Sequence, residues 1–104
     1  MEKINPKVYL KAYVDEYRNE PKGYYYISGY ANKLLFLIEK LSNDEINLYF
    51  VKLRLEDFIN DVLEDLSRSN PKSKNYKVKL NSALNGLSDI KSDFFRRIEN
   101  VNFE

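Results

Sequence analysis

Apolar residues recur at intervals of three and four positions along almost the whole chain, and little interrupts the repeat. That interval places the apolar side chains on one face of an α-helix. Only three glycines and three prolines are present, and these are the residues that most often end helices. The pattern therefore predicts an all-α protein whose helices cover one another's apolar faces.

Four segments carry such a stripe. We expect helices at about residues 6–19, 25–41, 43–68 and 76–101. The 104 residues suit one domain, so residues 1–104 are expected to form a single bundle of about four helices. The short first helix favours an irregular bundle.

Two helix starts have clear local signals. Asn5 before Pro6 is a good N-cap followed by a proline that loses no helical hydrogen bond. Ser42-Asn43-Asp44-Glu45 matches a capping box, which predicts that the third helix begins directly after Ser42. Gly29, inside the second stripe, indicates a close helix crossing together with Ala31.

The start of the fourth helix is open. It could begin as early as Pro71, because Asn70-Pro71 repeats the first helix start. The alternation of residues 76–80 also fits a short strand, but one strand without a partner is not stable, so helix is favoured.

The chain contains no cysteine and no histidine. Disulfides, thiolate metal sites and a Ser-His-Asp triad are therefore excluded. We expect no catalytic residue, no cofactor and no metal site, and hence a protein that is not an enzyme. Asp57, Asp61 and Glu64 could bind Mg²⁺ or Ca²⁺, but acids at this spacing are common on solvated helix faces.

Charges are dense and balanced, with 17 basic and 16 acidic residues. The whole chain therefore has no electrostatic drive toward nucleic acid or anionic lipid. Its apolar runs are far too short to span a membrane, and its first residues lack the apolar segment of a secretion signal. We expect a soluble cytoplasmic protein without a membrane partner.

The third predicted helix carries side chains of interest on the side opposite its core stripe of Leu48, Val51, Leu55, Phe58, Ile59, Val62 and Leu66. That side changes from apolar to acidic along the helix, through Ile46, Tyr49, Phe50, Leu53, Asp57, Asp61 and Glu64. An apolar anchor beside an acidic patch is typical of a surface that binds another protein, including a basic nucleic-acid-binding one. Alternatively, the first half of the helix is buried on both sides and the acids form a solvated face.

A second candidate is the basic segment formed by Lys72, Lys74, Tyr76, Lys77 and Lys79, with Arg96 and Arg97 further on. Lysines around an aromatic side chain are typical of phosphate contact and base stacking. A lysine-rich segment of this kind is also an ordinary solvated connector.

Nine tyrosines are many for this length, and seven of them lie between residues 9 and 30, along the first predicted helix and around the start of the second. Tyrosine suits protein interfaces, since a large apolar ring carries a polar hydroxyl. The same residues could fill the rim of the core with their hydroxyls in water.

These observations favour a small helical protein-binding module that acts by occluding or regulating a macromolecular partner. An inhibitor, an immunity or antitoxin-like protein and an assembly adaptor are all of this kind. A nucleic-acid-binding accessory protein is the first alternative, and a homodimeric structural protein is the second.

Overall fold

The computed structural model describes residues 4–43 and 45–103, and all regular secondary structure in these ranges is helical. The elements are α1 (Pro6–Glu16), α2 (Tyr24–Leu41), α3 (Tyr49–Asp57), η1 (Phe58–Leu63), α4 (Glu64–Arg68) and α5 (Lys74–Ile98). Because α3, η1 and α4 follow one another without a break, they form one rod. The described residues thus form four helical rods, which confirms the predicted all-α bundle.

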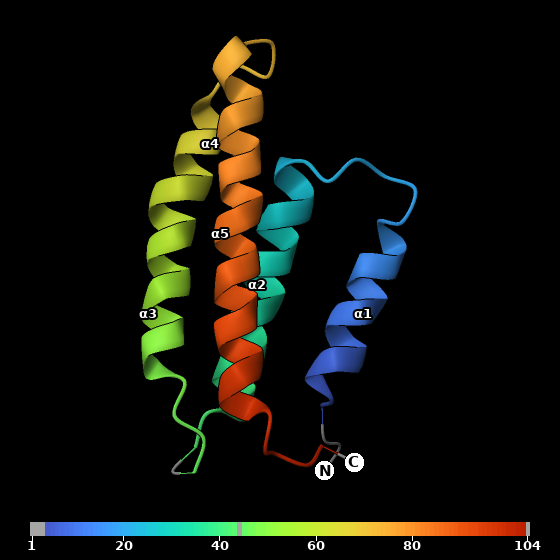
Figure 1. The fold of residues 1–104 in the computed structure, drawn as a ribbon, viewed down its shortest axis with the longest axis vertical. Helices are drawn as coiled ribbons and strands as arrows, with labels where there is room; N and C mark the ends of the chain where they lie inside the picture. Colours follow the sequence, from blue (N-terminus) through green and yellow to red (C-terminus); the bar gives the residue numbers. More distant parts are fainter. Residues whose placement is uncertain (1–3, 44, 104) are drawn as a thin grey trace.

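The rods are arranged unequally around the core. The α3–η1–α4 rod and α5 run antiparallel side by side, and α2 packs against both (Figure 1). Helix α1 lies to one side and packs against α2. The end of the rod at α4 and the first turns of α5 extend beyond α2, which makes the molecule elongated, at 46 × 29 × 20 Å.

Helix α1 begins where the sequence predicts. The side-chain oxygen of Asn5 accepts hydrogen bonds from the amides of Lys7 and Val8, at 3.1 and 3.3 Å, as an N-cap does. The helix ends at Glu16 rather than near residue 19. The reason is that several of the following backbone amides bond to carbonyls three residues back, which tightens the chain into turns.

The prediction that the third helix begins directly after Ser42 is wrong, since α3 begins at Tyr49. Ser42 instead ends α2, because its hydroxyl and its amide donate to the carbonyl of Ile38 at 2.6 and 3.0 Å. The side chain of Asn43 then accepts from the amides two and three residues ahead, in an Asx turn that keeps this segment out of a helix. Asp44, part of the predicted cap, lies outside the described residues.

The start of helix α5, which the sequence left open, is defined in the structure. It begins at Lys74, and the hydroxyl of Ser73 accepts from the Asn75 amide at 3.3 Å. The alternating residues 76–80 are therefore helical, which confirms the preference for helix over strand. The helix ends at Ile98 rather than near residue 101.

The π-helical element η1 changes which side chains reach the core. A π-turn closes over five residues rather than four, so it rotates the chain less per residue. Phe58 and Leu63, five positions apart, are both buried, at 6% and 3% exposure. Val62 is 38% exposed and Ile59 is half-buried, so the predicted place of Val62 in the core stripe is wrong.

Gly29 lies at a close approach of α1 and α2, as predicted. A Cβ atom at this position would overlap the hydroxyl of Tyr13. That hydroxyl donates to the carbonyl of Tyr26 at 2.9 Å, and Ala31 is fully buried nearby on α2. The missing side chain of Gly29 therefore lets Tyr13 bond to the backbone of the neighbouring helix.

Candidate functional site

Three apolar side chains are exposed together at the start of α3. Tyr49, Phe50 and Leu53 are 59%, 60% and 40% exposed, and we name them the α3 patch. The rings of Tyr49 and Phe50 touch edge to face, with centroids 5.5 Å apart. In the described part of the chain, no other helix exposes three large apolar side chains within two turns.

The α3 patch is exposed because the other side of the helix is already occupied. Val51 and Leu55 are fully buried where α3 packs against α2 and α5. Among the described residues no helix covers the outward face, so the first half of α3 is not buried on both sides. Ile46 differs from the prediction, since it precedes the helix and is half-buried against the core.

The predicted acids continue beyond the α3 patch. Asp57 ends α3, Asp61 lies in η1, and both are exposed. Glu64 is also exposed, and it forms an ion pair with Arg68 on the next turn. The described residues contain no group of three acids placed to hold a metal ion, so these three do not form a cation site in the structure.

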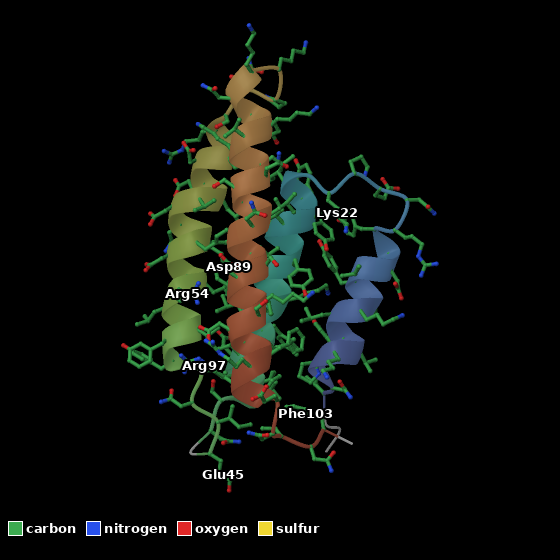
Figure 2. The ribbon with its side chains drawn as sticks, viewed as in Figure 1. Lys22, Glu45, Arg54, Asp89, Arg97 and Phe103 are labelled. Carbon is green, nitrogen blue, oxygen red and sulfur yellow. The ribbon has the colours of Figure 1, made fainter. Side chains whose placement is uncertain are left out.

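A cluster of arginines around one carboxylate, which we did not predict from the sequence, borders the same face. Asp93 on α5 is 6% exposed and is the one buried charged residue in the described ranges. Its carboxylate accepts from Arg54 at 3.0 Å, from Arg96 at 2.7 Å and from Arg97 at 3.1 Å. Arg54 and Arg97 both lie where α3 runs beside α5 (Figure 2).

The electrostatics of this cluster favour an ionised carboxylate. Burial tends to raise the pKa of Asp93, but the hydrogen bonds from Arg96, Arg97 and Arg54 outweigh it and hold the pKa below its usual value. Three guanidiniums against one carboxylate leave two positive charges in excess. Since Arg54 follows Phe50 by one helical turn, this excess charge lies beside the α3 patch.

A signal for this cluster does exist in the sequence. Asp93 lies three positions after Ile90 and next to Phe94, on the stripe that α5 buries. Arg96 and Arg97 follow it at the spacings that bring side chains together on one helix face. Only the contribution of Arg54 from another helix required the tertiary structure.

The basic segment is not assembled into a comparable surface. Lys72, Lys74 and Lys77 are exposed, but Tyr76 is half-buried against the core. Lys79 is engaged by Asp65 at 3.2 Å. The segment lies at the opposite end of α5 from Arg96, about 26 Å from Lys79 at 1.5 Å per residue, so the two basic groups are not brought together.

Most of the clustered tyrosines join α1 to α2. Tyr13, Tyr26 and Tyr30 are buried with their rings in mutual contact. Burial raises the pKa of each of these three hydroxyls, and neighbouring tyrosines add to the effect at Tyr13 and Tyr30. These residues belong to the core, whereas Tyr25 is 81% exposed.

The chain was compared with known proteins. No protein-family model, curated protein or solved structure matches it. None of the helices in the described ranges has the length and apolar character needed to cross a membrane.

Proposed function

We propose that this chain is a helical binding protein that captures another protein through the α3 patch and acts by covering part of that partner. The observation that carries the proposal is the exposure of Tyr49, Phe50 and Leu53 within two turns of one helix. Large aromatic side chains supply most of the binding energy in protein interfaces, and such exposed groups are unfavourable in water unless a partner covers them.

The charges near the α3 patch indicate what kind of partner surface would fit it. Asp57 and Asp61 favour basic side chains, and the excess charge at Arg54, Arg96 and Arg97 favours acidic ones. A partner surface with an apolar centre and with both basic and acidic groups around it would complement both. Such a protein binds and occludes; it does not catalyse a reaction.

Nucleic-acid binding through residues 72–79 is less favoured. Base stacking requires a free aromatic face, and Tyr76 packs against the core. Asp65 also partly neutralises Lys79. Homodimerisation through the α3 patch would use the same apolar residues. Sedimentation equilibrium of the purified chain distinguishes the two cases, because a homodimer has twice the mass of the monomer in the absence of any other protein.

The test compares the double variant Phe50→Ala/Leu53→Ala with Val8→Ala/Val78→Ala in affinity capture from the source cell. Val8 and Val78 are also exposed apolar residues, at 64% and 68%, but lie on α1 and α5. We expect one protein to be retained by the native chain and by the control but not by the α3 variant. With that protein purified, the dissociation constant should rise by roughly 30-fold or more, as expected for loss of a binding hot spot.

Charge reversal tests the acidic part separately. Asp57→Lys/Asp61→Lys should slow association with the same partner. The control Glu16→Lys/Glu20→Lys should not, because these two exposed acids lie at the end of α1 and in the connection that follows it, not on α3. Circular dichroism must show the same helix content in all variants. Equal retention of the partner by the native chain and Phe50→Ala/Leu53→Ala would contradict the proposal.

A further inference from the structure

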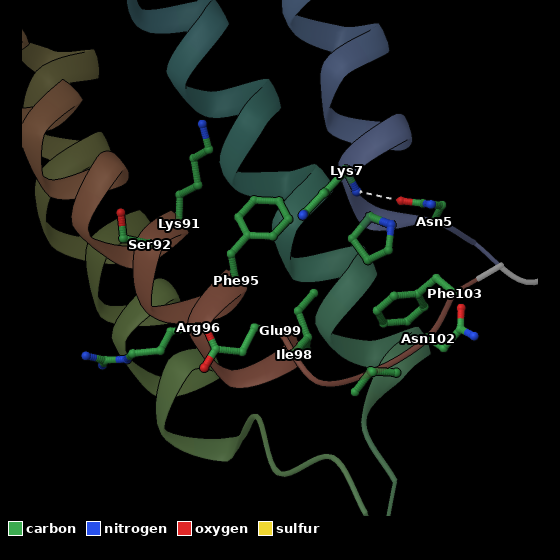
Figure 3. A pocket seen from close by; sticks show the side chains of 12 residues that line it. Asn5, Lys7, Lys91, Ser92, Phe95, Arg96, Ile98, Glu99, Asn102 and Phe103 are labelled. Carbon is green, nitrogen blue, oxygen red and sulfur yellow. Dashed lines mark hydrogen bonds between the residues drawn. The ribbon is translucent and has the colours of Figure 1, made fainter.

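A groove separates α1 from α5. Helix α1 packs against α2, and two cavities lie between α1 and α5 with volumes of about 340 and 730 Å³. The cavities share Lys7, Lys91 and Phe95 in their linings, so they form one continuous recess, which we name the α1–α5 groove. The larger cavity continues past the end of α5 to Phe103 (Figure 3).

The interior of the groove is apolar. Leu10 and Val14 from α1, Tyr30 from α2 and Phe95 from α5 line the smaller cavity. Phe95 packs on the core but is only half-buried, and its side chain lines both cavities of the groove. An apolar ligand placed here would cover surface that the fold itself leaves in contact with water.

The edge of the groove is basic at the smaller cavity. Lys7, Lys11 and Lys91 complete the lining of that cavity, and within the described ranges no carboxylate lines it. The larger cavity is also lined by a further cation, Arg96, and by the carboxylate of Glu99. The ammonium of Lys91 lies 5.9 Å from the centre of the Tyr30 ring, over the groove interior. Lys7 extends toward Phe95 in Figure 3. Lys11 is paired with Asp15 at 3.0 Å, which leaves Lys7 and Lys91 as the principal positive groups.

We propose that the α1–α5 groove binds a free anionic amphiphile, a long-chain carboxylate whose apolar tail lies on Leu10, Val14 and Phe95 and whose head group is held between Lys7 and Lys91. Charge complementarity selects the anionic head, and the apolar floor selects the tail. The volume is in the range of small-ligand sites, roughly 300–1,000 Å³. This site is on a different part of the molecule from the α3 patch and does not depend on the function proposed for that patch.

Calorimetric titration of the native chain with sodium dodecanoate, kept below its micelle concentration, tests the proposal. We expect saturable binding of one molecule per chain. Dodecanol and dodecyltrimethylammonium share the tail but lack the negative head, so each should bind at least about 10-fold more weakly, as the loss of charge-assisted hydrogen bonds implies. Equal affinity for all three compounds would overturn the proposal.

Matched variants locate the site. Lys7→Glu/Lys91→Glu should raise the dissociation constant for dodecanoate at least about 10-fold. Lys72→Glu/Lys77→Glu changes the same charge at exposed positions far from the groove and should leave it unchanged. Because Lys7 and Lys91 are exposed, both variants should keep the native helix content, which circular dichroism checks. The same weakening in both double variants would mean non-specific attraction and would refute the site.

Two further experiments test whether the groove instead binds a lipid surface or a second copy of the chain. Sedimentation with vesicles of phosphatidylglycerol tests a lipid surface, and binding to vesicles without binding to free dodecanoate would overturn the proposal. Sedimentation equilibrium tests a second copy, whose acidic residues Asp57 and Asp61 could enter the basic groove. Self-association that Lys7→Glu/Lys91→Glu abolishes, in a chain that does not bind dodecanoate, would also overturn it.

Discussion

Asp93 shows most directly how one residue combines burial with charge in this protein. An isolated carboxylate at 6% exposure would be strongly unfavourable, yet hydrogen bonds from Arg54, Arg96 and Arg97 compensate it. The guanidinium groups remain partly in water, so the cluster costs less desolvation than a fully buried ion pair. Asp93 thereby connects α3 to α5 beside the α3 patch.

Replacing Asp93 by Asn should lower the free energy of unfolding at neutral pH by about 1–3 kcal/mol, because hydrogen bonds to an ionised group are lost. The pKa of Asp93 is lowered in the folded state from its usual 3.8. Its stabilising contribution is therefore present above that pH and is lost as the pH falls through the folded-state pKa. Urea unfolding from neutral pH to about pH 2 should show a smaller acid-induced loss of stability in Asp93→Asn than in the native chain.

The control is Asp89→Asn, an exposed carboxylate one turn earlier on α5. It should keep the acid dependence of the native chain. If Asp93→Asn and Asp89→Asn give the same pH profile, the arginine cluster does not stabilise the folded state through this carboxylate.

Among the elements, η1 has the clearest effect on packing. Its π-turn moves Leu63 into the core and Val62 toward solvent, so the rod buries a different side chain than an uninterrupted α-helix would. Phe58, at the start of η1, fits against α5 because Gly86 lacks a side chain, and a Cβ atom there would lie 3.1 Å from the Phe58 ring. The rod thus meets α5 closely at this point.

Truncating Leu63 and Val62 in turn distinguishes a rod that contains the π-turn from one that is α-helical throughout. Leu63→Ala should destabilise the protein by about 2–5 kcal/mol, as loss of a buried leucine does. Val62→Ala removes a partly exposed side chain and should cost less than about 1 kcal/mol. Urea unfolding measures both. A greater loss for Val62→Ala would mean that the rod is α-helical throughout.

The positions of the helices could be predicted from the sequence, but not all of their boundaries or exposed faces. Apolar spacing located all four rods, and Asn5 correctly marked the start of α1. The helix start predicted at Ser42 was wrong because a serine hydroxyl can either accept a hydrogen bond at a helix start or donate one at a helix end. The side chain of Asn43 also forms a turn that competes with a helix. Apolar residues on both sides of α3 could not reveal which side faces water, because that depends on where α2 and α5 pack.

At the scale of the whole molecule, α1 is the least enclosed rod. Its contacts with α2 include the ring pair of Tyr9 with Phe36 and the Tyr13 hydroxyl, which donates to the backbone of α2, while the α1–α5 groove separates it from α5. Burial raises the pKa of Tyr13, Tyr26 and Tyr30 above the usual 10.0. Their contribution to stability is therefore complete below pH 10 and is lost as the pH rises from there toward the folded-state pKa values.

Alkaline pH should accordingly loosen the contact between α1 and α2. The midpoint of thermal unfolding, followed by circular dichroism, should fall above pH 10, and the fall should be smaller in Tyr13→Phe because one buried ionisable group is gone. Tyr25→Phe alters an exposed tyrosine and should retain the native pH dependence. Identical slopes in the two variants would show that Tyr13 does not link α1 stability to pH.

The peripheral position of α1 has a consequence for chain exchange between molecules. Helix α1 joins α2 through residues 17–23, and among the described elements it packs mainly against α2. If α1 of one molecule left its place, the α1 of another could form the same contacts with the same α2. Such domain swapping has little net cost because it preserves the native interface. A shorter connection between α1 and α2, unable to fold back, would favour the swapped dimer over the monomer.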